Sequence, residues 1–347
     1  MKHSLPSLVP DIATRLPVDV DYLTLNELEK FLRQGGPLML GEIHFGTAAM
    51  RDINGAGHPH ALVPMTQLSQ VPLIEVWSSR VPVNHGCAGD VVYAQTDEIL
   101  FGCLNYPPAA ARDIEAVVRR AYDAVLGVTR KEGFPHLLRI WNYFSDITQE
   151  AGGFDRYQCF CRGRFEALER HYGEFDRKLP AASAVGTQGG GLVLYFIAAR
   201  TPGRHRENPR QISAYHYPPQ YGPKSPSFAR AMLMRWDQDY SLYISGTASI
   251  VGHQSLHPGE VDLQVQETLS NLSALIDATA NEEGVGLHGL ASLNRLKVYI
   301  RHPEHLEAIQ AALDAVIAAH VPRLYLQADI CRDDLLLEIE GIARAAV

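Results

Sequence analysis

Groups that bind anions and transfer protons occur at alternating positions near the C-terminus. Arg323 and Cys331 lie on odd-numbered positions of one predicted strand, and Glu338 lies on the next. Successive side chains of a strand point to opposite faces, so a hairpin of these two strands would bring the three groups together. An arginine holds a carboxylate through paired hydrogen bonds, and a carboxyl group in a poorly solvated pocket transfers protons near neutral pH. A solvated sheet face with an ordinary ion pair fits the same spacing, so this alternative stays open.

The elements that must position these groups alternate between helix and strand. Apolar residues at helical spacing predict an amphipathic helix over 261–280. Apolar and polar residues alternate over 293–301, which is typical of a strand. A second helix is predicted over 303–320, because proline at its start suits the first helical turn. Two strands, 324–330 and 335–341, then form the predicted final hairpin.

Earlier in the chain, the pattern also mixes helices and strands. Thr24 and Glu27 form a capping box at the start of a helix, 24–34, which the glycines at 35 and 36 would end. Apolar spacing predicts further helices over 109–126 and 154–172, and strands over 37–43, 71–77, 137–143 and 192–199.

Composition changes sharply between residues 201 and 227. This stretch contains six prolines together with Tyr215, Tyr217 and Tyr221, so it does not form a regular helix. A plain connector is one interpretation. Connectors are rarely this aromatic, which favours an ordered loop that lines a site.

The overall composition indicates a globular protein. The chain has 347 residues, 46% of them hydrophobic, and a formal net charge of -8, which argues against nucleic acid or an anionic membrane as a partner. Its longest apolar stretch, near 191–199, is too short to span a bilayer. Five cysteines and an N-terminus without the apolar core of a signal peptide predict reduced thiols and a cytoplasmic location.

No motif predicts a metal or an organic cofactor. The pairs His58/His60 and Cys159/Cys161 lack the ligand number and spacing of a closed zinc site. The glycines at 189–191 lack the lysine of a phosphate-binding loop and precede a strand.

The segment from Leu242 to the C-terminus resembles a RidA (YjgF) domain. The resemblance rests on the helix–strand–helix order and on the ending 337–343, LEIEGIA, which is similar to that family's EIEAIA. It places the family's carboxylate-binding arginine fifteen residues before Glu338, at Arg323. It implies an α/β (α+β) fold of mixed sheets with helices packed on one face. RidA proteins are trimers, so we expect either a homotrimer or a monomer whose single chain imitates the trimer.

Most of the chain resembles a RidA-related family, the chorismatases. The segments that carry this resemblance are 139–143 (RIWNY), 156–164 (RYQCFCRGR), 211–218 (QISAYHYP), 222–230 (GPKSPSFAR), 244–249 (ISGTAS) and 328–332 (ADICR). In having a cysteine at position 331, the chain resembles the chorismatase subtypes that form hydroxybenzoates. The resemblance is strongest to the bifunctional subtype, which makes 3-hydroxybenzoate for aryl-polyene pigment and 4-hydroxybenzoate for ubiquinone.

The resemblance implies a lyase that splits pyruvate from chorismate without a cofactor. Glu338 would protonate the enol ether, and Cys331 would act on the fate of the ring. The residues expected to bind the substrate are Tyr157, Arg164, Tyr215, Tyr217, Arg230 and Arg323. RidA-like hydrolysis of enamines or imines, and non-catalytic binding of small aromatic acids, stay open as alternatives.

We also expect the chain to divide into three segments. Residues 1–200 would form an N-terminal chorismatase domain, for which a degenerate RidA-like unit is one option. Residues 201–236 would be the Pro/Tyr-rich, site-lining segment, and residues 237–347 the RidA-like C-terminal domain.

Overall fold

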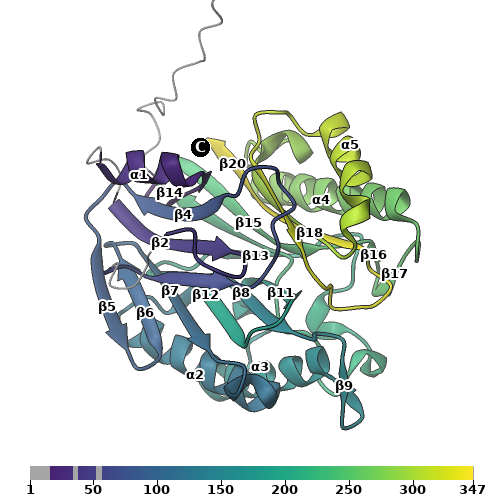
Figure 1. Cartoon of the computed structure of the whole chain (residues 1–347), viewed down its shortest axis with the longest axis horizontal. Helices are drawn as coiled ribbons and strands as arrows, with labels where there is room; N and C mark the ends of the chain where they lie inside the picture. Colours follow the sequence, from purple (N-terminus) through teal and green to yellow (C-terminus); the bar gives the residue numbers. More distant parts are fainter. Residues whose placement is uncertain (1–15, 34–37, 52–56, 347) are drawn as a thin grey trace, which may run out of the picture.

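The computed structural model describes residues 16–33, 38–51 and 57–346 of the chain. These residues form three main β-sheets, one of four strands and two of six, together with two small two-stranded ribbons. The helices lie at the periphery, and the sheets lie between them (Figure 1). The expected α/β (α+β) fold, with mixed sheets and helices packed on one face, is confirmed. None of the helices described is long and apolar enough to cross a membrane.

The four-stranded sheet comes from the N-terminal part of the chain. Its strands, in spatial order, are β1 (Asp19–Leu23), β4 (Ile74–Ser79), β2 (Leu38–Phe45) and β3 (His60–Val63). Helix α1 (Leu25–Arg33) packs Leu28 against β2 and β4. The predicted capping box is present, because the amides and side chains of Thr24 and Glu27 bond to one another in both directions. The two glycines expected to end this helix lie outside the described residues.

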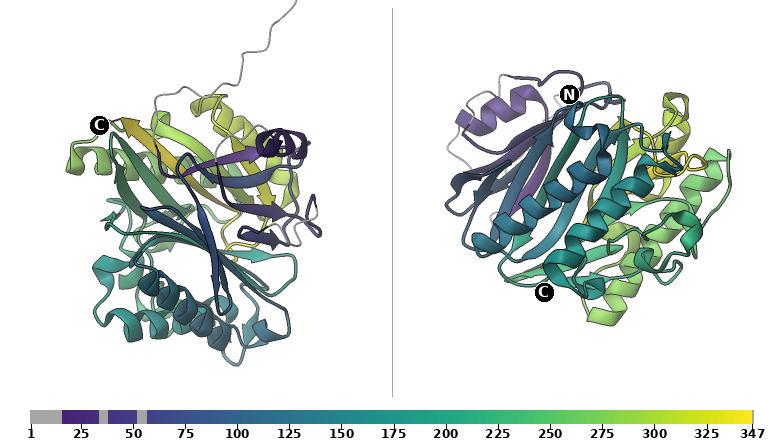
Figure 2. Two further views of the ribbon diagram at one scale, coloured as in Figure 1. Left: turned by 90° about the vertical axis from the view of Figure 1, so that its left-hand side faces the viewer. Right: turned by 90° about the horizontal axis from the view of Figure 1, so that it is seen from below.

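The middle sheet has six strands and is covered by two helices. Its strands, in spatial order, are β11 (Ala181–Thr187), β8 (His136–Ser145), β12 (Leu192–Ala199), β7 (Ile99–Tyr106), β6 (Val91–Gln95) and β5 (Asn84–Ala88). Helices α2 (Ile114–Lys131) and α3 (Arg156–Tyr172) lie side by side on its outer face (Figure 2). Each begins later than expected, because Asp113 and Asp155 cap the first turns by accepting backbone hydrogen bonds. The ribbon β9 (Glu150–Ala151) and β10 (Phe154–Asp155) precedes α3.

The C-terminal sheet also has six strands. Its strands, in spatial order, are β13 (Arg204–Arg206), β14 (Ala231–Trp236), β15 (Asp239–Thr247), β20 (Leu337–Ala346), β18 (Leu293–Ile300) and β19 (Arg323–Gln327). Helices α4 (Val261–Glu283) and α5 (Leu306–Val316) pack on one face, and the ribbon β16 (Ile250–Val251) and β17 (Gln254–Ser255) follows β15. Two strands of this sheet come from the predicted 201–236 segment. The three predicted segment boundaries stay a prediction.

The predicted C-terminal hairpin is wrong, because β18 lies between the last two strands. β18 runs parallel to β19 and antiparallel to β20. The chain reaches β19 from β18 through α5, and a helical crossover of this kind joins parallel strands. β18 is also buried on both faces, with Val298 in the helix-covered core and Tyr299 in the core between the sheets. A strand buried in this way needs a neighbour on each edge, and β19 and β20 supply them.

The inner faces of all three sheets share one core. It contains Ile43 from β2, Trp141 and Tyr195 from β8 and β12, and Tyr299 and Ile342 from β18 and β20. Separate apolar cores lie between each sheet and its own helices. The seams where the sheets meet therefore bring together residues that are far apart in the sequence.

Candidate active site

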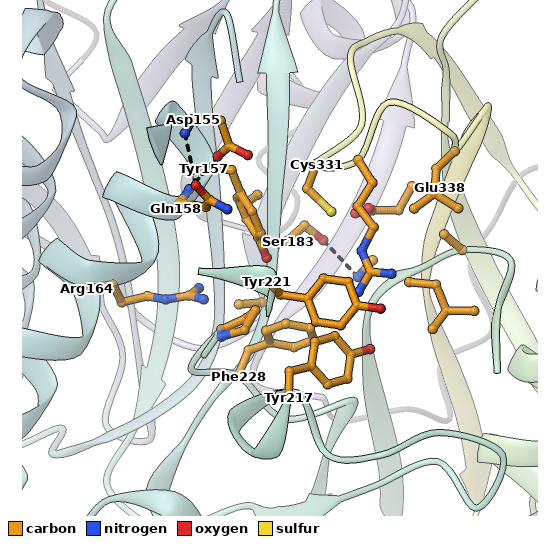
Figure 3. Close-up of a pocket in the computed structure, with 18 of the residues that line it drawn as sticks. Asp155, Tyr157, Gln158, Arg164, Ser183, Tyr217, Tyr221, Phe228, Cys331 and Glu338 are labelled. Atoms are coloured by element: carbon orange, nitrogen blue, oxygen red, sulfur yellow. Dashed lines mark hydrogen bonds between the residues drawn. The ribbon is translucent and has the colours of Figure 1, made fainter. Parts of the chain in front are cut away.

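A cavity of about 140 Å³ lies at the seam between the two six-stranded sheets. Backbone hydrogen bonds join segments of the two sheets beside it. The Ala229 amide donates to the Pro180 carbonyl at 2.9 Å, and the Gly186 amide donates to the Asp329 carbonyl at 2.7 Å. Side chains from α3 line one side of the cavity, and side chains from β20 and the loop before it line the opposite side (Figure 3).

Glu338 is a buried carboxyl group on β20 that faces this cavity. Its side chain lies directly against the backbone of Gly246 on β15, so that a Cβ atom at position 246 would overlap the carboxyl group. None of the described residues donates a hydrogen bond to it. Burial and the nearby charge of Glu340 raise the pKa of Glu338 to about 8, against the opposing effect of Arg139 and Arg230. Glu338 therefore holds a proton at neutral pH.

Three guanidinium groups line the cavity. They belong to Arg164 on α3, Arg230 before β14 and Arg332 in the loop before β20. Arg164 is only 1% exposed, and its Nε and Nη2 atoms have no hydrogen-bond partner in the described part of the chain. None of the three forms an ion pair with a described carboxylate. An uncompensated buried cation is costly, so this cavity is suited to an anionic ligand.

An aromatic wall comes from the Pro/Tyr-rich segment. Tyr217, Tyr221 and Phe228 line the cavity, and Arg230 donates a hydrogen bond of 2.7 Å to the Tyr217 hydroxyl. The Arg332 guanidinium lies 4.2 Å from the centre of the Tyr221 ring. These contacts fix both guanidinium groups against apolar surfaces while their remaining donors stay available.

Tyr157 and Cys331 lie on opposite sides of the cavity (Figure 3). Tyr157 stands in the first turn of α3, and burial raises its pKa well above the ordinary value, so its hydroxyl stays protonated. Burial and the proximity of Glu338 raise the pKa of Cys331 to about 12. The Cys331 thiol is therefore uncharged at neutral pH and is a poor nucleophile.

The structure brings six of the predicted site residues together around this cavity: Tyr157, Arg164, Tyr217, Arg230, Cys331 and Glu338. It does not place Tyr215 or Arg323 among the lining residues. The Tyr215 ring packs instead against His205 and His216, at centroid distances of 5.8 and 4.5 Å.

Arg323 lies away from the cavity, on the edge strand β19. Its guanidinium pairs with Asp314 on α5 and donates to the Ile317 carbonyl at 2.7 Å. β18 separates it from the strand that carries Glu338. The predicted convergence of Arg323 with Cys331 and Glu338 depended on the hairpin, which the chain does not form.

Several lining residues were not predicted from the sequence. Arg332 ends the segment 328–332 that carries part of the family resemblance, but it was not among the residues expected to bind the substrate. Gly246 and Ser183 have no side-chain pattern that marks a site. Tyr221 and Phe228 fall within or beside the aromatic stretch, which was the available indication for both.

The histidine and cysteine pairs have other surroundings. His58 lies 3.0 Å from the buried carboxylate of Glu42, which also pairs with Arg51. Cys159 and Cys161 are free thiols on α3.

Comparisons with known proteins fit this arrangement. The family model "Chorismatase FkbO/Hyg5-like, N-terminal" matches residues 75–198. The 3-hydroxybenzoate synthase of Streptomyces hygroscopicus is 34% identical over 337 residues, which cover 92% of this chain and 98% of that protein. A solved chorismatase structure covers 94% of this chain and 98% of its own, with a TM-score of 0.86 and 33% identity. RidA from the Antarctic bacterium Psychrobacter sp. matches 33% of this chain and 86% of its own, with a TM-score of 0.27 and 16% identity. The chain belongs to the chorismatase family.

Proposed function

We propose that the protein is a lyase that converts chorismate to pyruvate plus 3-hydroxybenzoate and 4-hydroxybenzoate. One observation carries the proposal. A protonated carboxyl group, Glu338, lies across the cavity from Arg164, a buried guanidinium without a carboxylate partner in the described chain. Chorismate has two carboxylates and an acid-labile enol ether, so it needs both kinds of group. The names of the relatives, chorismatase and 3-hydroxybenzoate synthase, support this substrate.

The two carboxylates of chorismate would bind to the three cavity arginines. Arg164 and Arg230 each keep buried N–H groups without partners, which suits charge-assisted hydrogen bonds to a carboxylate. Arg332 lies at the side of the cavity that continues into a wider opening lined by Gln254, Ser255 and Asp333. An anion bound here offsets the cost of burying the arginine charges.

Glu338 would start the reaction by giving its proton to the methylene carbon of the enol ether. This step produces an oxocarbenium-like centre and converts the side chain into a leaving group. The bond between the ring carbon and the ether oxygen then breaks, and its electron pair forms the ketone of pyruvate. The raised pKa of Glu338 suits this role, because a general acid must hold its proton at the working pH.

The neighbouring ring hydroxyl would displace pyruvate and return a proton to Glu338, which leaves an arene oxide. Opening of the oxide in one of two directions, with loss of a ring proton, gives 3- or 4-hydroxybenzoate. One molecule of chorismate has the same atoms as one pyruvate plus one hydroxybenzoate, so no water is consumed. Cys331 lies on the Glu338 side of the cavity as an uncharged thiol, where it can influence the direction of opening.

The enamine hydrolase alternative receives less support from the site. In RidA proteins it depends on the arginine that corresponds in spacing to Arg323. Here that guanidinium is held by Asp314, outside the cavity.

We further propose that the two products supply an aryl-polyene pigment and ubiquinone. In a strain that lacks the protein, added 3-hydroxybenzoate should restore pigment alone, and 4-hydroxybenzoate should restore ubiquinone alone. Restoration of both by either acid would contradict this division.

Incubation of the purified protein with chorismate tests the reaction. Liquid chromatography should show chorismate loss matched by pyruvate and by the sum of the two hydroxybenzoates. Pyruvate with a dihydrodiol in place of aromatic acids would contradict the lyase assignment. No consumption of chorismate, despite measurable binding, would leave the protein as a binder of small acids.

A further inference from the structure

Four charged side chains meet at the buried centre of the three sheets, behind the cavity. They are Glu75 on β4, Arg139 on β8, Lys297 on β18 and Glu340 on β20, and all are buried. The Lys297 ammonium lies 2.6 Å from Glu75 and 3.1 Å from Glu340, while Arg139 lies 2.7 Å from Glu340. The two positive and two negative charges balance within this cluster.

Glu340 is held in its ionised form by four neighbours. It receives hydrogen bonds from Arg139 at 2.7 Å, from the Trp141 indole at 2.6 Å and from the Ser183 hydroxyl at 2.5 Å, in addition to its ion pair with Lys297. Burial alone would raise the pKa of Glu340, but the charges of Lys297 and Arg139 outweigh it and lower the pKa. Glu340 is therefore a fixed negative charge.

This fixed charge stands next to Glu338. The two carboxyl groups are two positions apart on β20, so they point to the same face, with Cα atoms about 7 Å apart. Ser183 links their surroundings, because its hydroxyl donates to Glu340 and accepts a hydrogen bond of 3.0 Å from the Gly246 amide, beside Glu338. Two buried carboxyl groups at this distance do not both ionise easily, and the one without hydrogen-bond donors keeps the proton.

We propose that Glu340, fixed as a carboxylate by Lys297 and Arg139, is a positioning residue that keeps Glu338 in its protonated form. The inference rests on the proposed role of Glu338 as the proton donor. Glu75, Arg139, Lys297 and Glu340 are not among the described residues that line the cavity or its wider opening.

Other groups also face the two carboxyls. Those near Glu338 are Arg139, Tyr157, Arg230, Cys331 and Arg332. Those near Glu340 are Tyr22, Glu75, Arg139, Tyr143, Tyr195, Lys297 and Tyr299. Arg139 and Arg230 lower the pKa of Glu338, while burial and, after it, the charge of Glu340 raise it.

Carboxyl titration of the substrate-free wild-type protein tests the proposal directly. With glutamate labelled by ¹³C at the side-chain carboxyl, NMR should show Glu338 losing its proton near pH 8 and Glu340 ionised throughout the range from about 5 to 9. The Glu338→Gln and Glu340→Gln spectra assign the two signals. A wild-type protein in which Glu340 keeps its proton to a higher pH than Glu338 would overturn the inference. This experiment needs no turnover, so its outcome is independent of whether chorismate is the substrate.

Glu340→Gln supplies the kinetic counterpart. Removal of the fixed charge should lower, by about one to two units, the pH at which kcat/KM falls, because kcat/KM reports ionisation in the free enzyme. The matched control is Glu75→Gln, which removes the other carboxylate of Lys297 at the same depth but does not adjoin Glu338. The control should lose comparable stability and keep the wild-type pH profile. Equal shifts in both variants, or a shift in neither, would show that the cluster is only structural. If Glu340→Gln does not fold, Glu340→Asp removes the same glutamate signal from the spectrum and assigns it, so that the wild-type titration can still overturn the inference.

Discussion

Glu338 lies across the cavity from Arg164, so that a protonated carboxyl group and a guanidinium without an ion-pair partner among the described residues face the same space (Figure 3). The first comes from the C-terminal sheet and the second from a helix on the middle sheet. This pairing of an acid with an anion-binding group is the basis of the predictions that follow.

Replacement of Arg164 by alanine should weaken the binding of a non-reactive dicarboxylate analogue by about 1.5–3 kcal/mol, which is roughly 10- to 100-fold in Kd. The reason is the loss of charge-assisted hydrogen bonds from a preorganised guanidinium. Isothermal titration calorimetry measures the change. Arg323→Ala is the matched control, because it removes an arginine that lies outside the cavity. Equal weakening by both replacements would contradict the assignment of the binding site.

Replacement of Cys331 by alanine should change the ratio of 3- to 4-hydroxybenzoate more than it changes the rate of pyruvate release. Protonation by Glu338 comes first, and the ring is committed to one product afterwards. Liquid chromatography of the acids and an enzymatic assay of pyruvate give both quantities from one reaction. Cys87→Ala, at an exposed thiol, should behave as wild type. A large loss of pyruvate release at an unchanged ratio would place Cys331 in the first step instead.

Replacement of Gly246 by alanine should reduce kcat strongly, because the added methyl group would overlap the Glu338 carboxyl and displace it. Steady-state kinetics with chorismate would show the effect. Gly127→Ala offers a control, since a Cβ at that position on α2 meets nothing within 4 Å. It should keep full activity and gain up to about 1 kcal/mol of stability. Wild-type kcat in Gly246→Ala would mean that the position of Glu338 is not critical.

Glu338 should also make the folded protein less stable as the pH rises. Its pKa is about 8 in the folded state and near 4.5 ordinarily, so between these values the unfolded chain loses a proton that the folded chain keeps. The contribution of Glu338 to the free energy of unfolding is therefore fully present below about pH 4.5 and is lost as the pH rises to about 8. Glu338→Gln cannot ionise, so its free energy of unfolding in denaturant should exceed that of wild type by an amount that grows to the order of 5 kcal/mol at pH 9.

The exposed Glu304→Gln is the control for this stability comparison and should follow wild type at both ends of the pH range. If the free energies of unfolding of Glu338→Gln and wild type changed in parallel with pH, the Glu338 carboxyl group would not keep its proton in the folded state between about pH 4.5 and 8.

Local patterns in the sequence located most of the strands and helices of the C-terminal sheet. The alternation over 293–301 and the apolar spacing over 261–280 correspond to β18 and α4. The pairing of β18 with both β19 and β20 is set by contacts between distant segments, which periodicity does not report. For the same reason the spacing between Arg323 and Glu338 did not predict that they would be neighbours.

The site itself was only partly predictable. Arg164 and Arg230 were reached through the family resemblance, Glu338 was singled out by the strand pattern and given its role by the resemblance, and the aromatic stretch indicated a loop at the site. Arg332 and Gly246 acquire their roles from the seam between two sheets, which forms only in the folded chain. Charge alone could not distinguish Arg332 from Arg323. The fold places Arg332 at the cavity, whereas Arg323 lies on β19, beyond β18, and pairs with Asp314.

Turnover of chorismate by Glu338→Gln tests the central claim most directly. The variant keeps the size and burial of the side chain but removes the transferable proton, so kcat should fall by about 10²- to 10⁴-fold while the Kd for chorismate stays within about threefold of wild type. In the wild-type protein, kcat/KM should fall as the pH rises through about 8, where Glu338 of the free enzyme loses its proton. A Glu338→Gln protein that releases pyruvate at the wild-type rate would contradict the account.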